Sequence, residues 1–327
     1  MKIHAHLIYS YTSELITQLR DLLHPNVQLT VGKDLGTNPN YHILITGNPT
    51  REQLNASPRL HTLIIPWTGI PQETAKLMLE FPRIAIHNMH HNAASNAELA
   101  VTLLLAAAKA ILPYDQTLRQ NDWSMRYERP GPALGLAGQT ALVLGYGHIG
   151  KRVARFCRAL DMTVLAVKRH ATDASDEWAH EIHPSAALHA LLPRANALII
   201  CLPLTPETEG LIGTAELELL PQAAVLVNIG RGLIVDQAAL YAALRNGRLH
   251  SAGLDVWYNY PEDKAVRSST PPADFPFHEL ENVVMSPHRG SDTAATEAAR
   301  MPHLARLLNT AARGEPMPNR LDLTAGY

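Results

Sequence analysis

The sequence TALVLGYGHIG, residues 140–150, joins a short apolar run to three glycines spaced Gly-x-Gly-x-x-Gly. The apolar run predicts a strand, and the residues after the last glycine predict a helix. In this context the glycines allow a tight turn, a close approach of the backbone to a pyrophosphate, and close packing of helix on strand. We therefore expect the turn to bind a dinucleotide, with the pyrophosphate at the helix N-terminus. The residues assigned to this site are Gly145, Gly147, His148, Ile149 and Gly150.

Short apolar runs alternate with longer helical patterns on both sides of this stretch, which is typical of α/β proteins. A long helical pattern at residues 93–119, with an expected kink at Pro113, separates two such series. We therefore expect two doubly wound parallel-sheet domains, with a final helix at 291–313 packed back on the first. The expected strands are 3–8, 27–31, 41–45, 63–66 and 84–87 in the first series, and 140–144, 162–167, 197–202, 224–228, 251–256 and 283–285 in the second.

The composition limits the partners of the chain. Its 327 residues, 46% hydrophobic and 18% charged, suit two globular domains. A formal net charge of −2 gives no basic field for nucleic acid or an anionic membrane. No apolar stretch approaches the ~20 residues of a membrane-spanning helix, and the N-terminus lacks a secretory pattern. Cys157 and Cys201 suggest no disulfide framework. We expect a cytoplasmic enzyme acting on a small molecule, with neither nucleic acid nor membrane as partner.

Cofactor choice is expected at the end of the strand that follows the glycine turn. An Asp or Glu about 20 residues on would bind a ribose 2′-hydroxyl and repel a 2′-phosphate. Here Lys168-Arg169-His170 begins 23 residues after Gly145 and contains no carboxylate. Guanidinium and ammonium groups suit a phosphate dianion, so we expect Lys168 and Arg169 to bind NADP. If both are only solvated charges at a strand end, NAD is the alternative.

Four later segments carry a resemblance to a known family: CLPLTPETEGLI at 201–212, VNIGRG at 227–232, LDVW at 254–257 and SPHRG at 286–290. Together with the glycine turn, they resemble the D-isomer-specific 2-hydroxyacid dehydrogenases of the formate/glycerate dehydrogenase-like superfamily, which use NAD(P) and no metal. The resemblance implies a flavodoxin-like substrate domain at 1–94 and 293–327 and a Rossmann-type NAD(P)-binding domain at 95–292. The cofactor contacts that it implies are Leu202, Pro203, Thr208, Asn228, Ile229, Gly230, Asp255, His288 and Gly290.

The resemblance also implies a catalytic pair, Arg231 and His288, and the two residue types suit the chemistry. Reduction of a 2-keto acid needs its carboxylate fixed, its carbonyl polarised and a proton delivered as the hydride arrives. The guanidinium of Arg231 offers a planar fork for the carboxylate and carbonyl oxygens. His288 can give a proton to the nascent alkoxide and take it back in reverse. Family members point the counterpart of Asp255 at the nicotinamide carboxamide, and a structural strand-end cap is a second role for this residue.

One position departs from the family pattern. Where members usually carry a glutamate before a proline, to pair with the histidine, this chain has Tyr260 before Pro261. A carboxylate favours imidazolium, whereas a phenol brings no full charge. We expect His288 to be less readily protonated, which shifts the balance from keto-acid reduction toward oxidation near neutral pH, with Tyr260 as its catalytic partner. Formate dehydrogenases also lack the glutamate. The alternative is that Glu262 folds back and substitutes for it.

Two segments of the first domain resemble substrate-binding parts of the family. The turn PWTGI at 66–70 resembles one whose backbone N–H groups hold the substrate carboxylate. Trp67 is expected either to close over the substrate or to cover core. Asn92 matches an asparagine that contacts substrate in formate dehydrogenases, and the alternative is that Asn92 or Ser95 caps the long helix. The substrate contacts so assigned are Trp67, Thr68, Gly69, Asn92 and Arg231.

These expectations combine into one function with two rivals. We expect hydride transfer between NAD(P)H and a small 2-keto or 2-hydroxy acid, of the glyoxylate or hydroxypyruvate reductase type. A formate- or phosphonate-type dehydrogenase is favoured by Tyr260 and Asn92. A non-catalytic NAD(P)-sensing protein is opposed by the presence of Arg231 and His288. The histidines at 87, 90 and 91 fall between a strand and a helix, so no metal is expected. The resemblance suggests a homodimer, with the long helix and the cofactor domain at the interface.

Overall fold

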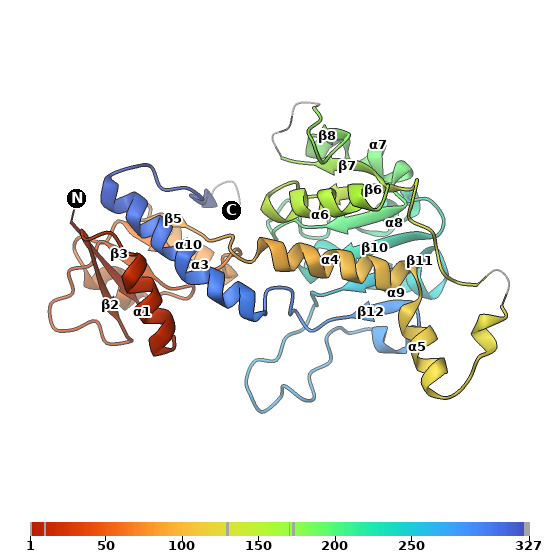
Figure 1. The fold of residues 1–327 in the computed structure, drawn as a ribbon, viewed down its shortest axis with the longest axis horizontal. Helices are drawn as coiled ribbons and strands as arrows, with labels where there is room; N and C mark the ends of the chain where they lie inside the picture. The colour runs from red at the N-terminus through yellow and green to blue at the C-terminus, as the bar shows by residue number, and fades with distance from the viewer. Residues whose placement is uncertain (1, 10, 129–130, 170, 172–173, 324–327) are drawn as a thin grey trace. The chain divides into compact units, whose positions relative to one another are not determined.

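The structure is a computed structural model that describes residues 2–9, 11–128, 131–169, 171 and 174–323. The chain forms two compact units (Figure 1). Unit 1 comprises Met1–Asn92 and Ser291–Tyr327, and unit 2 comprises Ala93–Gly290. Each boundary falls two residues before the expected one. Because each unit has its own buried core, each is described by itself.

Unit 1 contains a five-stranded sheet in the order β2-β1-β3-β4-β5, with every neighbouring pair parallel. This flavodoxin-like order reverses direction between β1 and β3. Alternate residues of β3 face opposite sides: Ile43 and Ile45 pack with α1 and α10, and Leu44 packs in the other core. The strands are β1 Ile3–Leu7, β2 Val27–Val31, β3 Ile43–Ile45, β4 Thr62–Ile64 and β5 Ala85–His87, and the helices are α1 Ser13–Leu22, α2 Arg51–Ala56, α3 Gln72–Met78 and α10 Ala294–Arg313.

Side-chain caps fix where the helices of unit 1 begin. The hydroxyl of Thr12 accepts the N–H of Leu15 at the start of α1, and Thr50 forms a reciprocal capping box with Gln53 at α2. Thr293 caps α10, so this helix begins three residues later than expected. Thr46, Pro66 and the other residues that follow the strands lie at the carboxyl edge of the sheet, where parallel α/β sheets bind ligands.

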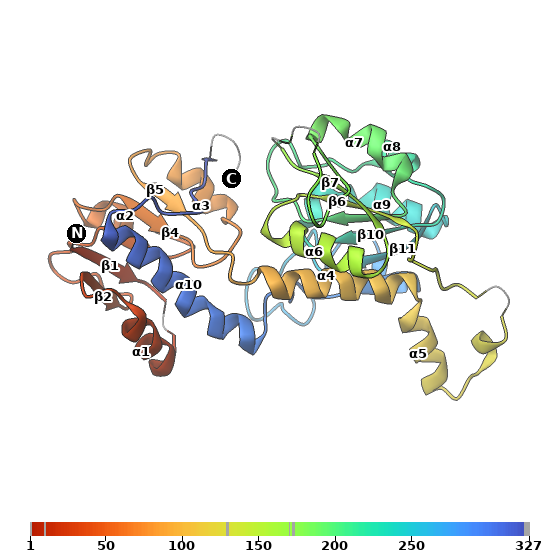
Figure 2. The same cartoon turned by 45° about the horizontal axis from the view of Figure 1, so that its top comes forward.

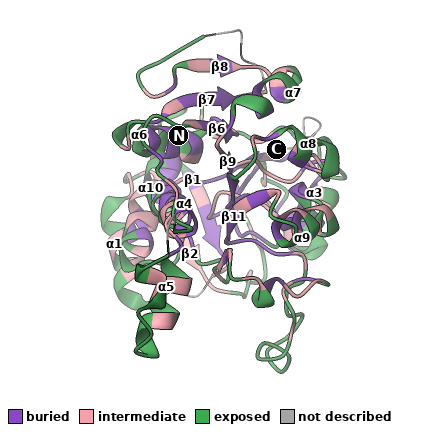
Figure 3. Ribbon diagram, turned by 90° about the vertical axis from the view of Figure 1, so that its right-hand side faces the viewer, coloured by how far each residue is buried: buried purple, intermediate pink, exposed green. Residues whose placement is uncertain are grey.

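Unit 2 contains a seven-stranded parallel sheet in the order β12-β11-β10-β9-β6-β7-β8. The chain reverses its direction across the sheet between β6 and β9, as in a Rossmann fold, so the expected fold class is confirmed. Figure 3 shows the buried strands and the more exposed α5. The strands are β6 Thr140–Leu144, β7 Thr163–Val167, β8 Glu181–His183, β9 Ala197–Ile200, β10 Ala224–Asn228, β11 Leu249–Leu254 and β12 Val283–Met285.

Helices cover both faces of this sheet (Figure 2). On one face α4 packs against α6, β10 and β11, and on the other α9 packs against β11 and α8. No single described helix is long and apolar enough to cross a membrane, although α4 and α5 pass that test as a bent pair. The helices are α4 Ala93–Ala108, α5 Ile111–Arg119, α6 His148–Ala159, α7 Leu188–Leu191, α8 Thr214–Leu219 and α9 Gln237–Arg245, with short 3₁₀ turns at Ser124–Arg126, Ser185–Ala187, Leu192–Arg194, Gly232–Ile234 and Phe277–Glu279.

The expected kink at Pro113 is wrong. The helical pattern breaks earlier, at Ala110, whose φ of +50° is left-handed, and the two helices are bent by 65°. Pro113 lies in the first turn of α5, where a missing N–H leaves no helical hydrogen bond unmade. Neither Lys109 nor Ala110 is a residue that usually ends a helix, so the sequence did not predict this break.

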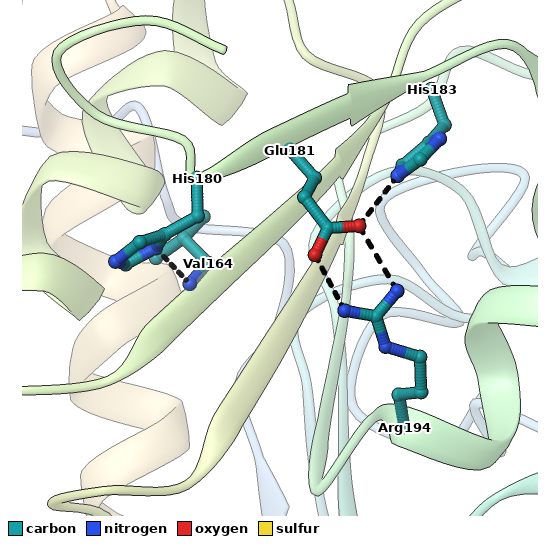
Figure 4. Close-up of polar contacts among 5 residues, drawn as sticks. All are labelled: Val164, His180, Glu181, His183 and Arg194. Atoms are coloured by element: carbon teal, nitrogen blue, oxygen red, sulfur yellow. Dashed lines mark hydrogen bonds and ion pairs between the residues drawn. The ribbon is translucent and has the colours of Figure 1, made fainter. Parts of the chain in front are cut away.

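The edge strand β8 was missed because its sequence Glu-Ile-His lacks an apolar run. It is held by charge (Figure 4): the guanidinium of Arg194 donates to both oxygens of Glu181, at 2.6 and 3.0 Å, and His183 Nε2 lies 2.8 Å from the same carboxylate. These contacts from Arg194 and His183 lower the pKa of Glu181 to about 2. Next to the strand, His180 Nδ1 accepts the backbone N–H of Val164 at 2.9 Å.

Candidate active site

The glycine turn follows β6 at the carboxyl edge of the unit 2 sheet. Gly145 has a φ of +95°, and a Cβ on Gly150 would lie 2.1 Å from the Gly145 carbonyl oxygen, so both positions need glycine. A Cβ on Gly147 would meet nothing within 4 Å, which leaves the space above the turn open. Helix α6 begins at His148 without a side-chain cap. Its first N–H groups therefore suit an anion, and the turn fits a pyrophosphate.

The end of β7 carries the basic pair Lys168 and Arg169, while His170 lies outside the described residues. Lys168 is exposed and Arg169 half-buried. An acid that sequence reasoning missed lies near this pair. The Thr205 hydroxyl and the residue's own backbone lower the pKa of Glu207, and the charge of Arg169 lowers it further. Because Glu207 belongs to the loop after β9, its approach to Arg169 depends on tertiary structure.

The loop after β9 is shaped by Thr208. The Thr208 hydroxyl donates to the Pro203 carbonyl at 2.7 Å and accepts the N–H of Thr205 at 2.8 Å. A Cβ on Gly230 would lie 2.5 Å from the carbonyl oxygen of Leu202, so this loop lies directly against the end of β10. A Cβ on Gly145 would lie 3.0 Å from the backbone nitrogen of Leu202, so the start of this loop also lies beside the glycine turn, whereas the Thr208 side chain holds the loop at Pro203.

Asn228 is the last residue of β10, and Arg231 follows three residues later. Buried Asn228 accepts the N–H of Gly230 and donates to the carbonyl of Arg231, at 3.0 and 2.9 Å. Arg231 donates from Nη1 to the Gly230 carbonyl at 2.7 Å. Burial lowers the pKa of Arg231, and within the described residues no carboxylate forms an ion pair with it. A desolvated cation without an acidic partner is unfavourable unless a ligand supplies the opposite charge.

Asp255, at the end of β11, holds the loop that carries His288. Its carboxylate is 1% exposed and accepts the Ser286 hydroxyl at 2.5 Å and the N–H groups of Arg289 and Gly290 at 2.9 and 3.2 Å. His288 itself has a φ of +58°, in the left-handed region that only a few per cent of non-glycine residues adopt. The structural role considered for Asp255 is thus present in the geometry. A contact with a nicotinamide carboxamide stays a prediction.

The side chain of Tyr260 contacts the imidazole of His288. Its phenolic oxygen is 3.0 Å from His288 Nδ1 and accepts the N–H of Trp257 at 3.1 Å. Burial and the nearby charge of Arg231 lower the pKa of His288, while Asp255 opposes this. Burial raises the pKa of Tyr260, although the Trp257 N–H and Arg231 act in the other direction. Glu262 is exposed and forms no hydrogen bond to His288 among the described contacts.

The PWTGI turn of unit 1 is tied to the loop after β5. Thr68 donates to the carbonyl of Met89 and to Oδ1 of Asn92, at 3.0 and 2.5 Å, and its own carbonyl accepts Nδ2 of Asn88 at 2.6 Å. Gly69 completes the turn and is half-buried. The Trp67 indole packs so closely on Gly47 that a Cβ there would lie 1.9 Å from it. Trp67 therefore covers core within unit 1.

Two further contacts concern Ser95 of α4 and His87 of unit 1. The Ser95 hydroxyl donates to the Gly290 carbonyl at 2.6 Å instead of capping α4, so the expected cap at Ser95 is wrong. His87 Nδ1 lies 2.7 Å from the carbonyl oxygen of Pro318. Among the residues that the structure describes, no cluster of His, Cys, Asp or Glu is arranged to hold a metal.

Arg300 is a residue at this edge that sequence reasoning missed. From α10 it donates to the Tyr11 hydroxyl and the Pro66 carbonyl, at 3.3 and 3.4 Å, and pairs with Glu297 at 2.5 Å. Burial, followed by the charges of Arg300 and His303, lowers the pKa of buried His91 to about 4. More than 200 residues separate Arg300 from the turn that it supports, so no local pattern marked it.

Comparison with known proteins gives consistent matches. Residues 101–290 match the family model described as "D-isomer specific 2-hydroxyacid dehydrogenase, NAD binding domain". The D-3-phosphoglycerate dehydrogenase of Archaeoglobus fulgidus is 30% identical over 289 residues, covering 87% of this chain and 52% of that protein. The glyoxylate reductase of Korarchaeum cryptofilum is 35% identical over 230 residues, covering 69% and 65%. The chain thus spans between half and two thirds of the length of these relatives.

A solved structure shares the fold. The crystal structure of a D-isomer specific 2-hydroxyacid dehydrogenase from Xanthobacter autotrophicus Py2, in complex with NADPH and MES, has a TM-score of 0.79. It is 24% identical in sequence, and the match covers 99% of this chain and 100% of that one.

Proposed function

This chain belongs to the D-isomer specific 2-hydroxyacid dehydrogenase family, as its sequence resemblance indicated, and from that premise we propose that it transfers a hydride between NAD(P)H and a small 2-keto or 2-hydroxy acid. The glyoxylate or hydroxypyruvate type is the substrate class proposed. One observation carries the proposal: Arg231 is a desolvated cation without a carboxylate partner, close enough to His288 to lower the pKa of that residue. This pairing suits an anionic substrate that exchanges a proton during the reaction.

The glycine turn and the segments around it would hold the cofactor. When bound, the nicotinamide supplies or accepts the hydride. The first N–H groups of α6, at His148 and Ile149, would bind its pyrophosphate. The remaining cofactor contacts that we propose are Gly145, Gly147, Gly150, Lys168, Arg169, Leu202, Pro203, Thr208, Asn228, Ile229, Gly230, Asp255, His288 and Gly290.

Arg231 would bind the acid. Its planar guanidinium can reach a carboxylate oxygen and the reacting carbonyl oxygen together, and thereby hold the carbonyl carbon in place. The same charge would stabilise the oxyanion that develops on hydride arrival. We also propose, from the family resemblance, that the backbone N–H groups of the turn Trp67–Gly69 bind the substrate carboxylate and that Asn92 contacts the substrate.

His288 and Tyr260 would handle the proton. In reduction, an imidazolium with a proton on each ring nitrogen would donate its Nε2 proton to the substrate oxygen and become neutral. Its Nδ1–H would stay directed at the Tyr260 oxygen, which also accepts the Trp257 N–H. In the reverse direction the neutral imidazole would take the substrate proton on Nε2. The phenolic oxygen can accept from Nδ1–H in both states, as a carboxylate would, but it brings no negative charge. Without a carboxylate, the imidazolium form is less favoured, and we propose a balance shifted toward oxidation near neutral pH.

We propose NADP over NAD. Lys168 and Arg169 support this preference, since neither position offers a carboxylate to a ribose hydroxyl. The carboxylate of Glu207 opposes this preference, because it already interacts with the charge of Arg169 and would repel a phosphate there. Calorimetric titration with NADP⁺ and NAD⁺ tests the preference. Tighter binding of NAD⁺ would contradict it.

A scan of nicotinamide absorbance tests the reaction. NADPH and NADH are supplied separately with glyoxylate, hydroxypyruvate, pyruvate and bulkier keto acids, and oxidised cofactors with formate, phosphite and 2-hydroxy acids. We expect turnover of a small keto acid, abolished in Arg231→Gln. Turnover of formate or phosphite alone would favour the rival oxidiser, which Tyr260 in place of glutamate supports. NADPH binding with no turnover would favour a sensing protein.

We propose a homodimer formed through α4, α5 and the cofactor domain. Helix α5 has no buried residue, and large apolar side chains on it and just beyond it are exposed. They include Ile111, Leu118, Trp123 and Tyr127, which are 51%, 49%, 58% and 73% exposed. Clustered exposed apolar side chains are typical of protein interfaces. Sedimentation should give a dimer mass, and Trp123→Glu should shift it toward monomer.

A cytoplasmic location stays a prediction.

A further inference from the structure

A carboxylate outside the catalytic centre joins the glycine turn to the segment that follows the basic pair. Tyr146, between the first two glycines, is 2% exposed, and its hydroxyl donates to Oδ1 of Asp176 at 2.6 Å. The Lys151 ammonium lies 3.4 Å from Oδ2 of Asp176 and 5.3 Å from the centre of the Tyr146 ring. The hydroxyl of the buried Tyr146 side chain is thus hydrogen-bonded to a carboxylate 30 residues further along the chain.

The same carboxylate also closes its own turn. Oδ1 of Asp176 accepts the N–H groups of Trp178 and Ala179, at 2.9 and 3.0 Å. The Trp178 ring lies under Arg155 of α6, with 5.2 Å between guanidinium carbon and ring centre. Residues 174–180, called here the clamp loop, are therefore attached to α6 at two points.

The clamp loop begins at Ala174, five residues after Arg169, and the strand β8 comes after it. Both the basic pair and the clamp loop are tied to β8. The Lys168 N–H donates to the His183 carbonyl at 3.0 Å, and Ala174 pairs with Ile182 in an antiparallel bridge. The clamp loop therefore limits where the basic pair can move relative to α6.

The glycine turn has an anchor that does not depend on the clamp loop. The N–H groups of Gly145 and Tyr146 donate to the carbonyl of Val167, at 3.1 and 3.0 Å. The pyrophosphate position is thus held by backbone bonds to β7, whereas the basic pair is tied to β8 and, through the bridge at Ala174, to the clamp loop that Asp176 and Trp178 attach to α6. A cofactor with a 2′-phosphate would bind both the glycine turn and the basic pair, whereas a cofactor without this phosphate would bind only the glycine turn.

We propose that Asp176 is a positioning residue that sets the spacing between the glycine turn and the basic pair, and so favours a cofactor carrying a 2′-phosphate. This inference rests on the proposed binding of NADP at Lys168 and Arg169. Asp176 acts through Tyr146 and Lys151 and does not itself touch the phosphate. Its negative charge, which would repel a phosphate if free, is balanced by Lys151 and by three hydrogen-bond donors.

Calorimetric titration of the full chain with NADP⁺ and NAD⁺ tests this role. We expect Tyr146→Phe, which keeps the ring and removes only the hydroxyl, to weaken NADP⁺ binding about fivefold and NAD⁺ binding less than twofold. Asp176→Ala should weaken NADP⁺ binding about tenfold, and Asp176→Asn, which keeps an acceptor oxygen, should recover most of it. The matched control is Asp274→Ala, because Asp274 also accepts two side-chain hydrogen bonds on a loop of unit 2.

The outcomes separate the inference from the cofactor proposal. Equal weakening of both cofactors in Tyr146→Phe would show a general support of the glycine turn and overturn the inference, as would no change in either. Tighter NADP⁺ binding by Asp176→Ala would also overturn it. The negative charge of Asp176, and not the spacing between the glycine turn and the basic pair, would then determine the affinity. If wild-type protein binds NAD⁺ more tightly, the cofactor proposal itself fails, and the inference with it. Circular dichroism confirms that each variant is folded.

Discussion

The phenolic oxygen of Tyr260 lies 3.0 Å from Nδ1 of His288 and accepts the backbone N–H of Trp257 at 3.1 Å. The second contact fixes the oxygen in place, and the first places it at the ring nitrogen Nδ1 of the imidazole. Because the hydroxyl is neutral, the burial of His288 and the nearby Arg231 lower the pKa of His288 without a carboxylate to offset them at Nδ1.

Tyr260→Glu should make reduction easier at neutral pH. A carboxylate at this position raises the pKa of His288, so the alkaline fall in the rate of keto-acid reduction moves to higher pH. Tyr260→Phe should lower kcat about tenfold in both directions, because Nδ1 loses its partner. The measurement is kcat/KM against pH for reduction and oxidation. Glu262→Gln is the control, and a larger loss there than in Tyr260→Phe would refute the role of the phenol.

Arg231→Gln should lower kcat/KM by a factor of about 10³ without lowering stability. The reason is that Arg231 is desolvated without an acidic partner, so its removal relieves a burial penalty. The thermal midpoint should therefore stay equal or rise. The matched control is Arg194→Gln, which removes an ion pair with Glu181 and should leave kcat/KM unchanged. Loss of folding in Arg231→Gln would indicate a structural role for this arginine.

Asp255→Asn should lower both activity and stability. One amide group cannot accept the Ser286 hydroxyl and the Arg289 and Gly290 N–H groups as the carboxylate does, so at least one buried donor loses its acceptor. The expected loss of unfolding free energy is about 1–3 kcal/mol. The loop of His288 should also loosen, which lowers kcat. Urea unfolding and steady-state kinetics measure the two effects, and unchanged kcat with reduced stability would restrict Asp255 to folding.

On acidification, unit 1 should lose stability at a higher pH than the range in which carboxylates are protonated. Burial lowers the pKa of His6, His87 and His91 in the folded state, that of His91 to about 4. A histidine that stays neutral when folded but binds a proton when unfolded loses its contribution as pH falls from about 6.5 to its folded pKa. We expect the free energy of opening at β5, obtained from hydrogen exchange after correction for the intrinsic exchange rate at each pH, to fall between pH 7 and pH 5. His91→Gln should reduce this fall, and an unchanged slope would exclude His91 as a cause.

The sequence indicated those parts of the site that depend on local spacing. The glycine turn was predicted because a strand, three glycines and a helix are contiguous, and the structure shows that Gly145 and Gly150 have no room for a side chain. By contrast, Arg300 and Glu207 reach the site edges only through tertiary packing. Tyr146 was passed over because its partner, Asp176, comes from a loop that no motif marks.

Errors in secondary structure have a similar origin. The strand β8 is polar and short, and its place in the sheet depends on Arg194, which precedes a different strand. The break at Ala110 replaced the kink expected at Pro113, because proline in a first helical turn is compatible with a helix. Hydrophobic periodicity records which side chains are buried, and it carries little information about polar edges and caps.

The polar edge strand also bears on how copies of this chain can associate. A sheet whose last strand is long, flat and apolar can accept a strand from another molecule and so grow into an aggregate. Here the last strand is three residues long, carries Glu181 and His183, and is partly covered by the bridge from Ala174. Sheet-to-sheet extension at this side of unit 2 is therefore disfavoured.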